Sequence, residues 1–186
     1  MASVSEMIPL GTTAPDFNLR EVTNGALTTL DDLPGDALVV MFLSRHCPYV
    51  VHVQEGLSAL VDEYVEAGRP VSFVGICSND AASHPDDAPE SLAEQKRLVG
   101  FSFPYLHDET QEVARAYGAA CTPDFFVFDA DRRLAYRGQM DGARPGNDEV
   151  PVSGIDLRKA IDLVLDGKPV PEPHLPSMGC GIKWRG

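Results

Sequence analysis

The chain has 186 residues, with 15 basic against 28 acidic side chains and a formal net charge of −13 at pH 7. Such an acidic chain repels phosphate backbones, which argues against a nucleic acid as partner. Hydrophobic residues make up 44% and charged residues 23% of the sequence, an ordinary globular composition that argues against disorder. The length favours one domain over residues 1–186, with a core at 12–167 and an extended C-terminal tail at 168–186.

Neither a membrane span nor a leader is expected. The longest apolar run, residues 37–43, is far shorter than the roughly 20 residues that a spanning helix needs. The first fifteen residues lack the basic start and apolar stretch of a secretory signal. We therefore expect a cytoplasmic protein that does not act at a membrane.

Hydrophobic periodicity and turn residues divide the chain into alternating strands and helices. In chain order, the predicted elements are a hairpin (17–19 and 26–29), a turn (31–35), a strand (37–43), a helix (48–67), a strand (71–76), a polar loop (78–90), a helix (91–99), a strand (105–107), a helix (109–117), a second hairpin (124–128 and 133–137) and a helix (155–165). The run 37–43 is apolar throughout, which is typical of a central strand covered on both faces.

The order of these elements predicts an α/β fold. A strand, a crossover helix and a second strand form a parallel pair of right-handed connection. The second hairpin adds antiparallel strands, so we expect a mixed central sheet with helices on both faces. The first hairpin is expected as an N-terminal extension.

Four cysteines, at positions 47, 77, 121 and 180, are too far apart for a CxxC pair or for the usual zinc spacings. Four in 186 residues is also too few for a secreted disulfide framework. No metal or other cofactor is expected. The cysteines are therefore either inert buried thiols or redox-active groups.

Cys47 stands where a strand ends and a helix begins. Pro48 favours the first helical position, which makes Cys47 the N-cap. Its sulfur is expected to face the free N–H groups and the positive end of the helix dipole. Arg45 and His46 add positive charge nearby. We therefore expect a partly exposed, ionised thiol, which is a nucleophile toward peroxides and disulfides.

Several motifs resemble those of one superfamily. Cys47-Pro48-Tyr49-Val50 resembles the CPYC motif of thioredoxins with Val50 in place of the second cysteine, and the run from Ser44 to Cys47 resembles the end of the peroxidatic motif of peroxiredoxins. Thr122-Pro123 resembles the cis-proline turn that faces the active cysteine. With CTPDFFVFD, RPGND and GCGIKW, the chain is similar to the peroxiredoxin-like branch of the AhpC/TSA group, within the thioredoxin superfamily. The resemblance implies a thioredoxin-like fold.

The sequence also departs from these motifs. Val40 stands where the full peroxidatic motif has a proline, and the Thr122-Pro123 turn occupies the place of the peroxide-binding arginine. The candidate replacements for that arginine are Arg45, Arg137 and Arg144. Because Val50 replaces the second cysteine, dithiol exchange through a CxxC pair is excluded.

A resolving thiol must then come from elsewhere in the chain. Cys180 lies between two glycines on the tail, and Cys121 lies two residues before Pro123; both are candidates. Cys77 is expected to be structural. The loop 139–154, which holds Arg144, is expected to emerge near Cys47, and Trp184 is expected to anchor the tail.

The leading hypothesis is a thiol-dependent oxidoreductase in which the Cys47 thiolate reduces peroxides. A thioredoxin-like dithiol or a low-molecular-weight thiol then regenerates it. One alternative is an oxidoreductase that acts on protein disulfides. Another is a non-catalytic module that binds a partner or senses redox state, and a zinc site that includes Cys47 and His46 is the least favoured. A homodimer is left open.

Overall fold

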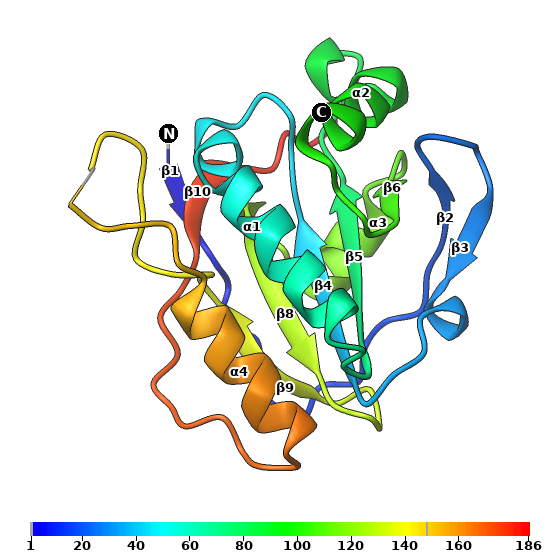
Figure 1. Ribbon diagram of the computed structural model, residues 1–186. Helices are drawn as coiled ribbons and strands as arrows, with labels where there is room; N and C mark the ends of the chain where they lie inside the picture. The colour runs from blue at the N-terminus through cyan, green and yellow to red at the C-terminus, as the bar shows by residue number, and fades with distance from the viewer. Residues whose placement is uncertain (1, 148) are drawn as a thin grey trace.

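The computed structural model describes residues 2–147 and 149–186, and its centre is a seven-stranded mixed sheet (Figure 1). The strands lie in the order β3-β2-β6-β5-β4-β8-β9. Their bounds are β2 Asn18–Glu21, β3 Leu27–Thr29, β4 Ala37–Phe42, β5 Val71–Cys77, β6 Tyr105–His107, β8 Asp124–Phe128 and β9 Leu134–Gly138. β4, β5 and β6 are parallel neighbours, and the other pairs are antiparallel. This is the mixed sheet that the sequence predicts.

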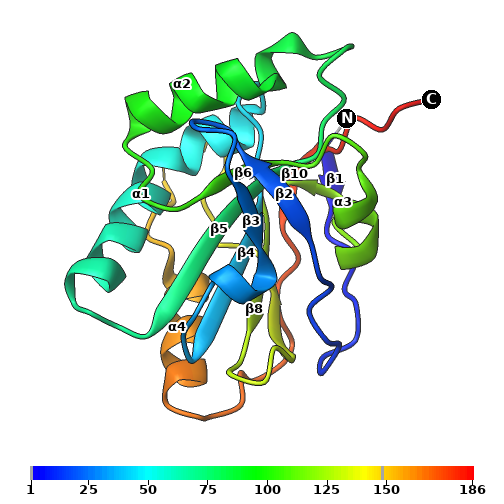
Figure 2. The same ribbon diagram turned by 90° about the vertical axis from the view of Figure 1, so that its right-hand side faces the viewer.

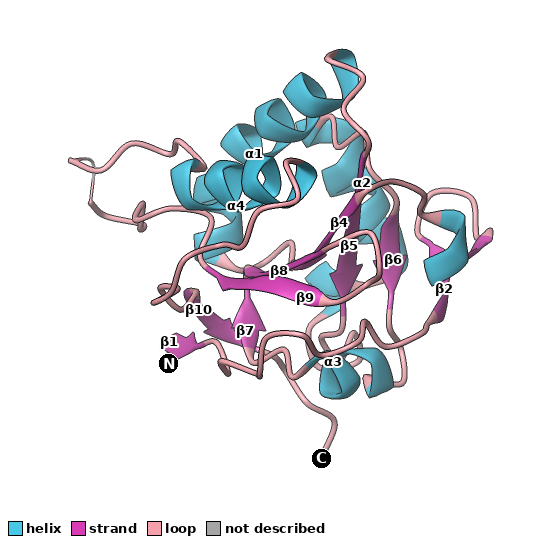
Figure 3. Ribbon diagram, turned by 90° about the horizontal axis from the view of Figure 1, so that it is seen from below, coloured by secondary structure: helices cyan, strands magenta, loops and turns pink. Residues whose placement is uncertain are grey.

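Helices cover both faces of the sheet (Figure 3). The helices are α1 Pro48–Glu66, α2 Pro89–Val99, α3 Glu112–Tyr117 and α4 Ile155–Leu165, with single 3₁₀ turns η1 Leu30–Asp32 and η2 Pro85–Asp87. Alternate residues of β4 divide the core: Met41 packs on the side of α1, α2 and α4, and Phe42 packs on the side of α3. Every β4 side chain is buried, which confirms the prediction of a strand covered on both faces.

A second, three-stranded sheet joins the two ends of the chain (Figure 3). Its strands are β1 Ala2–Val4, β10 Met178–Gly181 and β7 Cys121–Thr122, with β10 in the middle. Cys180 pairs with Thr122 on one side and with Ala2 on the other. The tail is extended here, as expected, and it is held in a sheet because both edges of β10 are hydrogen-bonded to other parts of the chain.

Residues 177–185, called the C-terminal strap below, are fastened at both ends. At its start, the Ser177 hydroxyl donates to the Gly138 carbonyl at 2.6 Å. At its end, the Lys183 amide donates to the side chain of Asn79 at 2.7 Å. The Trp184 ring lies 4.3 Å from the guanidinium carbon of Arg115, which confirms its expected role as a tail anchor.

The first hairpin extends the central sheet as expected, whereas α3 differs from the sequence expectation. Strand β2 pairs with β6, so the hairpin β2–β3 adds to the sheet and β3 is its edge strand (Figure 2). Helix α3 begins at Glu112 rather than at 109, since Gln111 takes a left-handed conformation (φ 65°) and breaks the run. The Asp108 carboxylate accepts the Ala114 amide at 2.9 Å and so caps this later start.

Asp124 is a buried carboxyl group beneath the strap, directly after Pro123 in the chain. It accepts the Ser5 hydroxyl at 2.6 Å, and the Ser5 oxygen in turn accepts the Ser177 amide at 3.0 Å. Burial raises the pKa of Asp124 to about 7, against the lowering effect of the Ser5 hydrogen bond and neighbouring amides. The folded protein thus keeps a proton that the unfolded chain loses near pH 4.

This difference predicts a pH-dependent stability. Protonated Asp124 contributes to the free energy of unfolding. This contribution is complete below about pH 4 and is lost as the pH rises to about 7, at about 1.4 kcal/mol per pH unit. In Asp124→Asn this loss should vanish, so the variant should gain about 2–3 kcal/mol relative to the parent between pH 5 and pH 8. Urea unfolding at both pH values measures it. Asp131→Asn, at an exposed turn carboxylate, is the control, and equal pH slopes for both variants and the parent would contradict the prediction.

Candidate active site around Cys47

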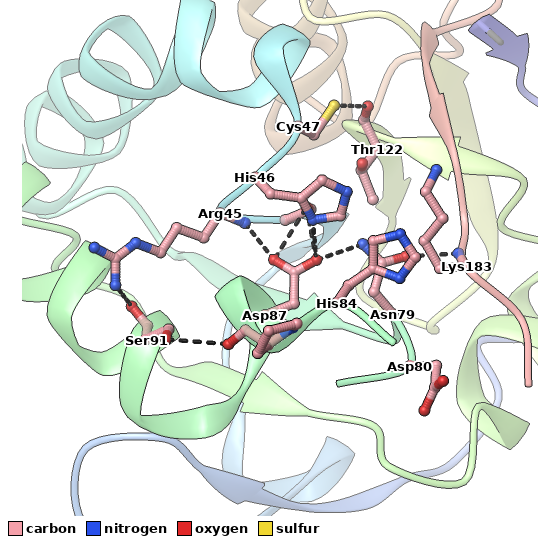
Figure 4. A network of polar contacts seen from close by, with 12 residues as sticks. Arg45, His46, Cys47, Asn79, Asp80, His84, Asp87, Ser91, Thr122 and Lys183 are labelled. Atoms are coloured by element: carbon pink, nitrogen blue, oxygen red, sulfur yellow. Dashed lines mark hydrogen bonds and ion pairs between the residues drawn. The ribbon is translucent and has the colours of Figure 1, made fainter. Parts of the chain in front are cut away.

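Cys47 occupies the predicted N-cap of α1, with Pro48 in the first helical position. The backbone conformation is extended (φ −74°, ψ 118°), as an N-cap requires. Its side chain is completely buried, so the expectation of partial exposure is wrong. The sulfur makes no capping bond to the helix and donates instead to the carbonyl oxygen of Thr122 at 3.0 Å (Figure 4).

The turn at Thr122-Pro123 has the cis peptide bond that the sequence resemblance implies. Thr122 is the residue of β7 that pairs with Cys180 of β10, and its carbonyl is the acceptor for Cys47. The chain at Gly179 passes so close that a Cβ atom there would lie 1.9 Å from the same carbonyl oxygen. The strap therefore crosses directly over the turn that faces Cys47.

This crossing brings the predicted pair Cys47 and Cys180 together. Burial and the neighbouring Cys47 thiol raise the pKa of Cys180 to about 11. Both cysteines are free thiols, and Cys180 is partly exposed whereas Cys47 is not. The two cysteines are thus a reduced pair, in which the more exposed member, Cys180, is on the strap.

The second candidate partner, Cys121, lies in the same small sheet, and Cys47 and Cys180 are among its neighbours. Its sulfur lies 3.7 Å from the Pro123 carbonyl and 4.0 Å from that of Ser177. Burial, with a further contribution from Asp124, raises the pKa of this thiol far above its ordinary range. Cys77 is likewise buried, as expected of a structural residue.

Asp87 is the centre of a polar network that the sequence did not identify (Figure 4). It lies in η2, within the loop expected at 78–90, and its side chain is completely buried. The carboxylate accepts hydrogen bonds from the Ser44 hydroxyl (2.9 Å), the Arg45 amide (2.7 Å), the His46 Nδ1 (2.6 Å) and the Asn79 Nδ2 (2.7 Å). Two of the predicted site residues, Ser44 and His46, thus hydrogen-bond Asp87.

The three candidate arginines make their hydrogen bonds away from the Cys47 sulfur. Arg45 turns toward α2, where it binds the Ser91 carbonyl and Glu94. The guanidinium of Arg137 binds Glu172 and His174 in the tail. Arg144 binds the carbonyl oxygens of Asp141 and Ala143 and the side chain of Gln139.

Of these arginines, Arg144 still lies in the expected neighbourhood. It lines a narrow groove together with Tyr49 and Pro123, which confirms that the loop 139–154 emerges beside the turn. A larger cavity, of about 700 Å³, lies apart from these residues between the β2–β3 hairpin and α3. Neither Cys47 nor Cys180 lines this larger cavity.

Residues 2–147 and 149–186 also bear on two other kinds of site, a metal centre and a membrane span. No group of three or more His, Cys, Asp or Glu side chains in this part of the chain is arranged to hold a metal ion. Within the same residues, no helix combines the length and apolar character that crossing a membrane requires.

The comparisons with known proteins agree with the fold. An uncharacterized conserved protein from Geobacillus kaustophilus is 49% identical, with a TM-score of 0.95 over 100% of this chain and 97% of that one. A hypothetical protein from Sinorhizobium meliloti 1021 is 48% identical, with a TM-score of 0.93 over 98% of both chains. Peroxidoxin BcpB from Mycobacterium tuberculosis is 21% identical, with a TM-score of 0.58 over 84% of this chain and 94% of that one, and so shares the fold.

No curated protein matches the chain. The family model described as "AhpC/TSA family" matches residues 10–137, well over half of the sequence. That segment contains Cys47, Asp87 and the Thr122-Pro123 turn. The chain has the thioredoxin fold and belongs to the AhpC/TSA family.

Proposed function

We propose that the protein is a thiol-dependent peroxidase in which Cys47 is the nucleophile and Cys180 the resolving thiol. The observation that carries this proposal is that Cys180 of the strap pairs with Thr122, whose carbonyl contacts the Cys47 sulfur, so that the Cys47 thiol is near enough to raise the pKa of Cys180. A completely buried Cys47 also favours a small peroxide over the disulfide of a folded protein, which would need the strap to move away. The AhpC/TSA family membership supports the same class of chemistry.

The reaction has three balanced steps. The Cys47 thiolate attacks one peroxide oxygen, the O–O bond breaks, and an alcohol or water leaves as Cys47 becomes a sulfenic acid. The Cys180 sulfur then attacks the Cys47 sulfur, the S–O bond breaks, and water leaves as the disulfide forms. An external dithiol, thioredoxin-like or of low molecular weight, reduces this disulfide and is itself oxidised. Such donors are available in a reducing compartment such as the cytoplasm.

Reduction of protein disulfides is the second candidate, and one observation favours it. All three candidate arginines bind other groups, so none of them is committed to holding a peroxide beside the sulfur. In this alternative the Cys47 thiolate attacks a substrate disulfide, and Cys180 releases the substrate thiol from the mixed disulfide. Hydrogen peroxide and a small disulfide, offered separately at equal concentration, distinguish the two by which one oxidises Cys47 faster.

Mass spectrometry after one equivalent of hydrogen peroxide tests the proposed pair. In the parent protein we expect a Cys47–Cys180 disulfide, with Cys77 and Cys121 still reduced. In Cys180→Ser the reaction should stop at the Cys47 sulfenic acid, and turnover with a dithiol that reduces only disulfides should fall by about 100-fold or more, because the resolving sulfur is gone.

Cys121→Ser is the matched control, since Cys121 is the other candidate thiol in the same sheet. It should form the Cys47–Cys180 disulfide at the parental rate. A Cys47–Cys121 disulfide in the parent, or a loss of turnover in Cys121→Ser alone, would contradict the assignment of Cys180. Oxidation of Cys47 no faster than that of a free cysteine would contradict peroxidase activity itself.

A further inference from the structure

The network around Asp87 joins the two sides of the thiol pair. On one side, the carboxylate binds the segment from Ser44 to His46, which leads directly into Cys47. On the other side, it accepts Nδ2 of Asn79, whose Oδ1 accepts the Lys183 amide of the strap at 2.7 Å. One buried carboxylate thus positions both the residue before Cys47 and the end of the segment that carries Cys180.

His46 is held by this network in a single orientation. Its Nδ1 lies 2.6 Å from Asp87, and its ring stacks on His84 with 5.0 Å between the centroids. An imidazole that donates from Nδ1 to a carboxylate presents Nε2 as its proton-accepting atom. In Figure 4 that second nitrogen lies on the side of the ring that faces Thr122 and Cys47. The side chain is 21% exposed, so protons can exchange with solvent.

Disulfide closure requires a group that moves a proton. The Cys180 thiol must lose its proton as its sulfur attacks, and the hydroxyl that leaves Cys47 must gain one to depart as water. Because the pKa of Cys180 is raised to about 11, this thiol is protonated at neutral pH. A general base close to the pair would therefore accelerate closure.

We propose that Asp87 is a positioning residue that holds His46 with Nδ1 occupied, so that the His46 Nε2 accepts the Cys180 proton and returns it to the leaving hydroxyl. This inference rests on the proposed function, because it assigns roles within its disulfide-forming step. Atoms and electrons balance: the S–S bond forms, the S–O bond breaks, and the proton moves from Cys180 to water through the imidazole.

The other ionisable groups around His46 are engaged elsewhere or carry the wrong charge. The Lys183 ammonium donates to the Gly181 carbonyl, and Arg45 pairs with Glu94. Asp80 binds Ser83 and Arg185. Of the remaining groups, Cys77 is fully buried, and His84 hydrogen-bonds the Ser83 hydroxyl through Nδ1. Cys121, near Cys180, is buried, and burial raises the pKa of its thiol.

The test compares Asp87→Asn with Asp86→Asn, the exposed carboxylate next to it in the same turn. Rapid mixing with peroxide, acid quenching and mass spectrometry between pH 6 and pH 9 follow sulfenic acid formation and disulfide closure separately. Closure in the parent should rise with pH less steeply than the Cys180 thiolate alone would dictate, because a base takes the proton within the step. In Asp87→Asn it should be at least about 10-fold slower at pH 7 and should rise tenfold per pH unit throughout, as the Cys180 thiolate alone would dictate.

His46→Gln should reproduce this profile, and the double variant should be no slower than either single one, since both residues act through one group. His46→Gln also serves if Asp87→Asn does not fold. A uniform slowing with the parental pH profile in either variant would assign Asp87 a merely structural role and overturn the proposal, as would an effect of Asp86→Asn equal to that of Asp87→Asn.

Disulfide closure can also be started without peroxide, which separates this proposal from the peroxidase function. Cys47 is first converted to its mixed disulfide with glutathione. This is done in the parent and, as a control that cannot close, in Cys180→Ser. In the parent, Cys180 attacks Cys47, the mixed disulfide breaks, and glutathione leaves with the proton. If peroxide fails to oxidise Cys47 but this closure depends on Asp87 and His46, the peroxidase proposal fails alone. If closure ignores both residues, the present proposal fails.

Discussion

Replacing Cys47 with serine is expected to abolish turnover of peroxide or disulfide, with a loss of at least about 1,000-fold. The nucleophile of the proposed reaction is the sulfur, and a serine hydroxyl at the same place neither ionises near neutral pH nor forms a disulfide. The fold should persist, because the hydroxyl can still donate to the Thr122 carbonyl that the thiol contacts at 3.0 Å. Dithiol consumption in the presence of hydrogen peroxide measures the loss, and circular dichroism checks the fold.

Cys121→Ala is the control for this experiment. Cys121 is buried in the same small sheet, and its replacement removes a thiol while leaving both members of the proposed pair in the chain. It should retain turnover within a few-fold. Should Cys47→Ser keep the parental rate, the chemistry would lie elsewhere, and a non-catalytic binding or redox-sensing module would become the better interpretation of the chain.

Substituting alanine for Gly179 is expected to have the next largest effect, by lifting the strap off the turn. A Cβ there would lie 1.9 Å from the Thr122 oxygen and 2.6 Å from its carbonyl carbon. Both atoms belong to the backbone, so no side chain can rotate away, and β10 must separate from β7. Overpacking of this kind typically costs about 1–3 kcal/mol of stability.

The substitution should change the rates of two reactions of Cys47 in opposite directions. Alkylation of Cys47 by iodoacetamide should become at least about 10-fold faster, because the thiol is no longer covered. Closure of the Cys47–Cys180 disulfide should become at least about 10-fold slower, because the resolving thiol is no longer held beside its partner. Both rates are measured by quenched labelling and mass spectrometry.

Gly142→Ala is the matched substitution, since its Cβ would meet only a Val150 methyl group at an ordinary 3.5 Å. It should leave both rates unchanged. If Gly179→Ala alkylates and closes at the parental rates, then contact between the strap and the turn does not control access to Cys47.

The central sheet was predictable because its signals are local. The apolar run of β4, the helical periodicity of α1 and the position of Pro48 after Cys47 each depend on residues that are close in sequence. Helix α4 has the bounds that its periodicity predicts, Ile155–Leu165. In such segments the hydrophobic pattern and the residues that begin or end each helix and strand decide the structure together.

The strap and the Asp87 network were not predictable for the opposite reason. The sequence of β10, MGCG, has low strand propensity, and it becomes a strand only because β1 and β7 offer hydrogen bonds on both sides. Asp87 lies in a polar loop, where the sequence does not distinguish it from its neighbour Asp86. Of the two, only Asp87 is buried. The difference arises from partners about 40 residues earlier in the chain, at Ser44 and His46.

The chain's sole tryptophan, Trp184, stands four residues beyond Cys180, with a cationic group over its ring. Indole emission responds to the charge and water around it, so undocking of the chain end should alter the fluorescence of the unlabelled protein. The molecule therefore contains its own optical reporter, with which undocking of the chain end during oxidation or reduction would be recorded in real time without a dye.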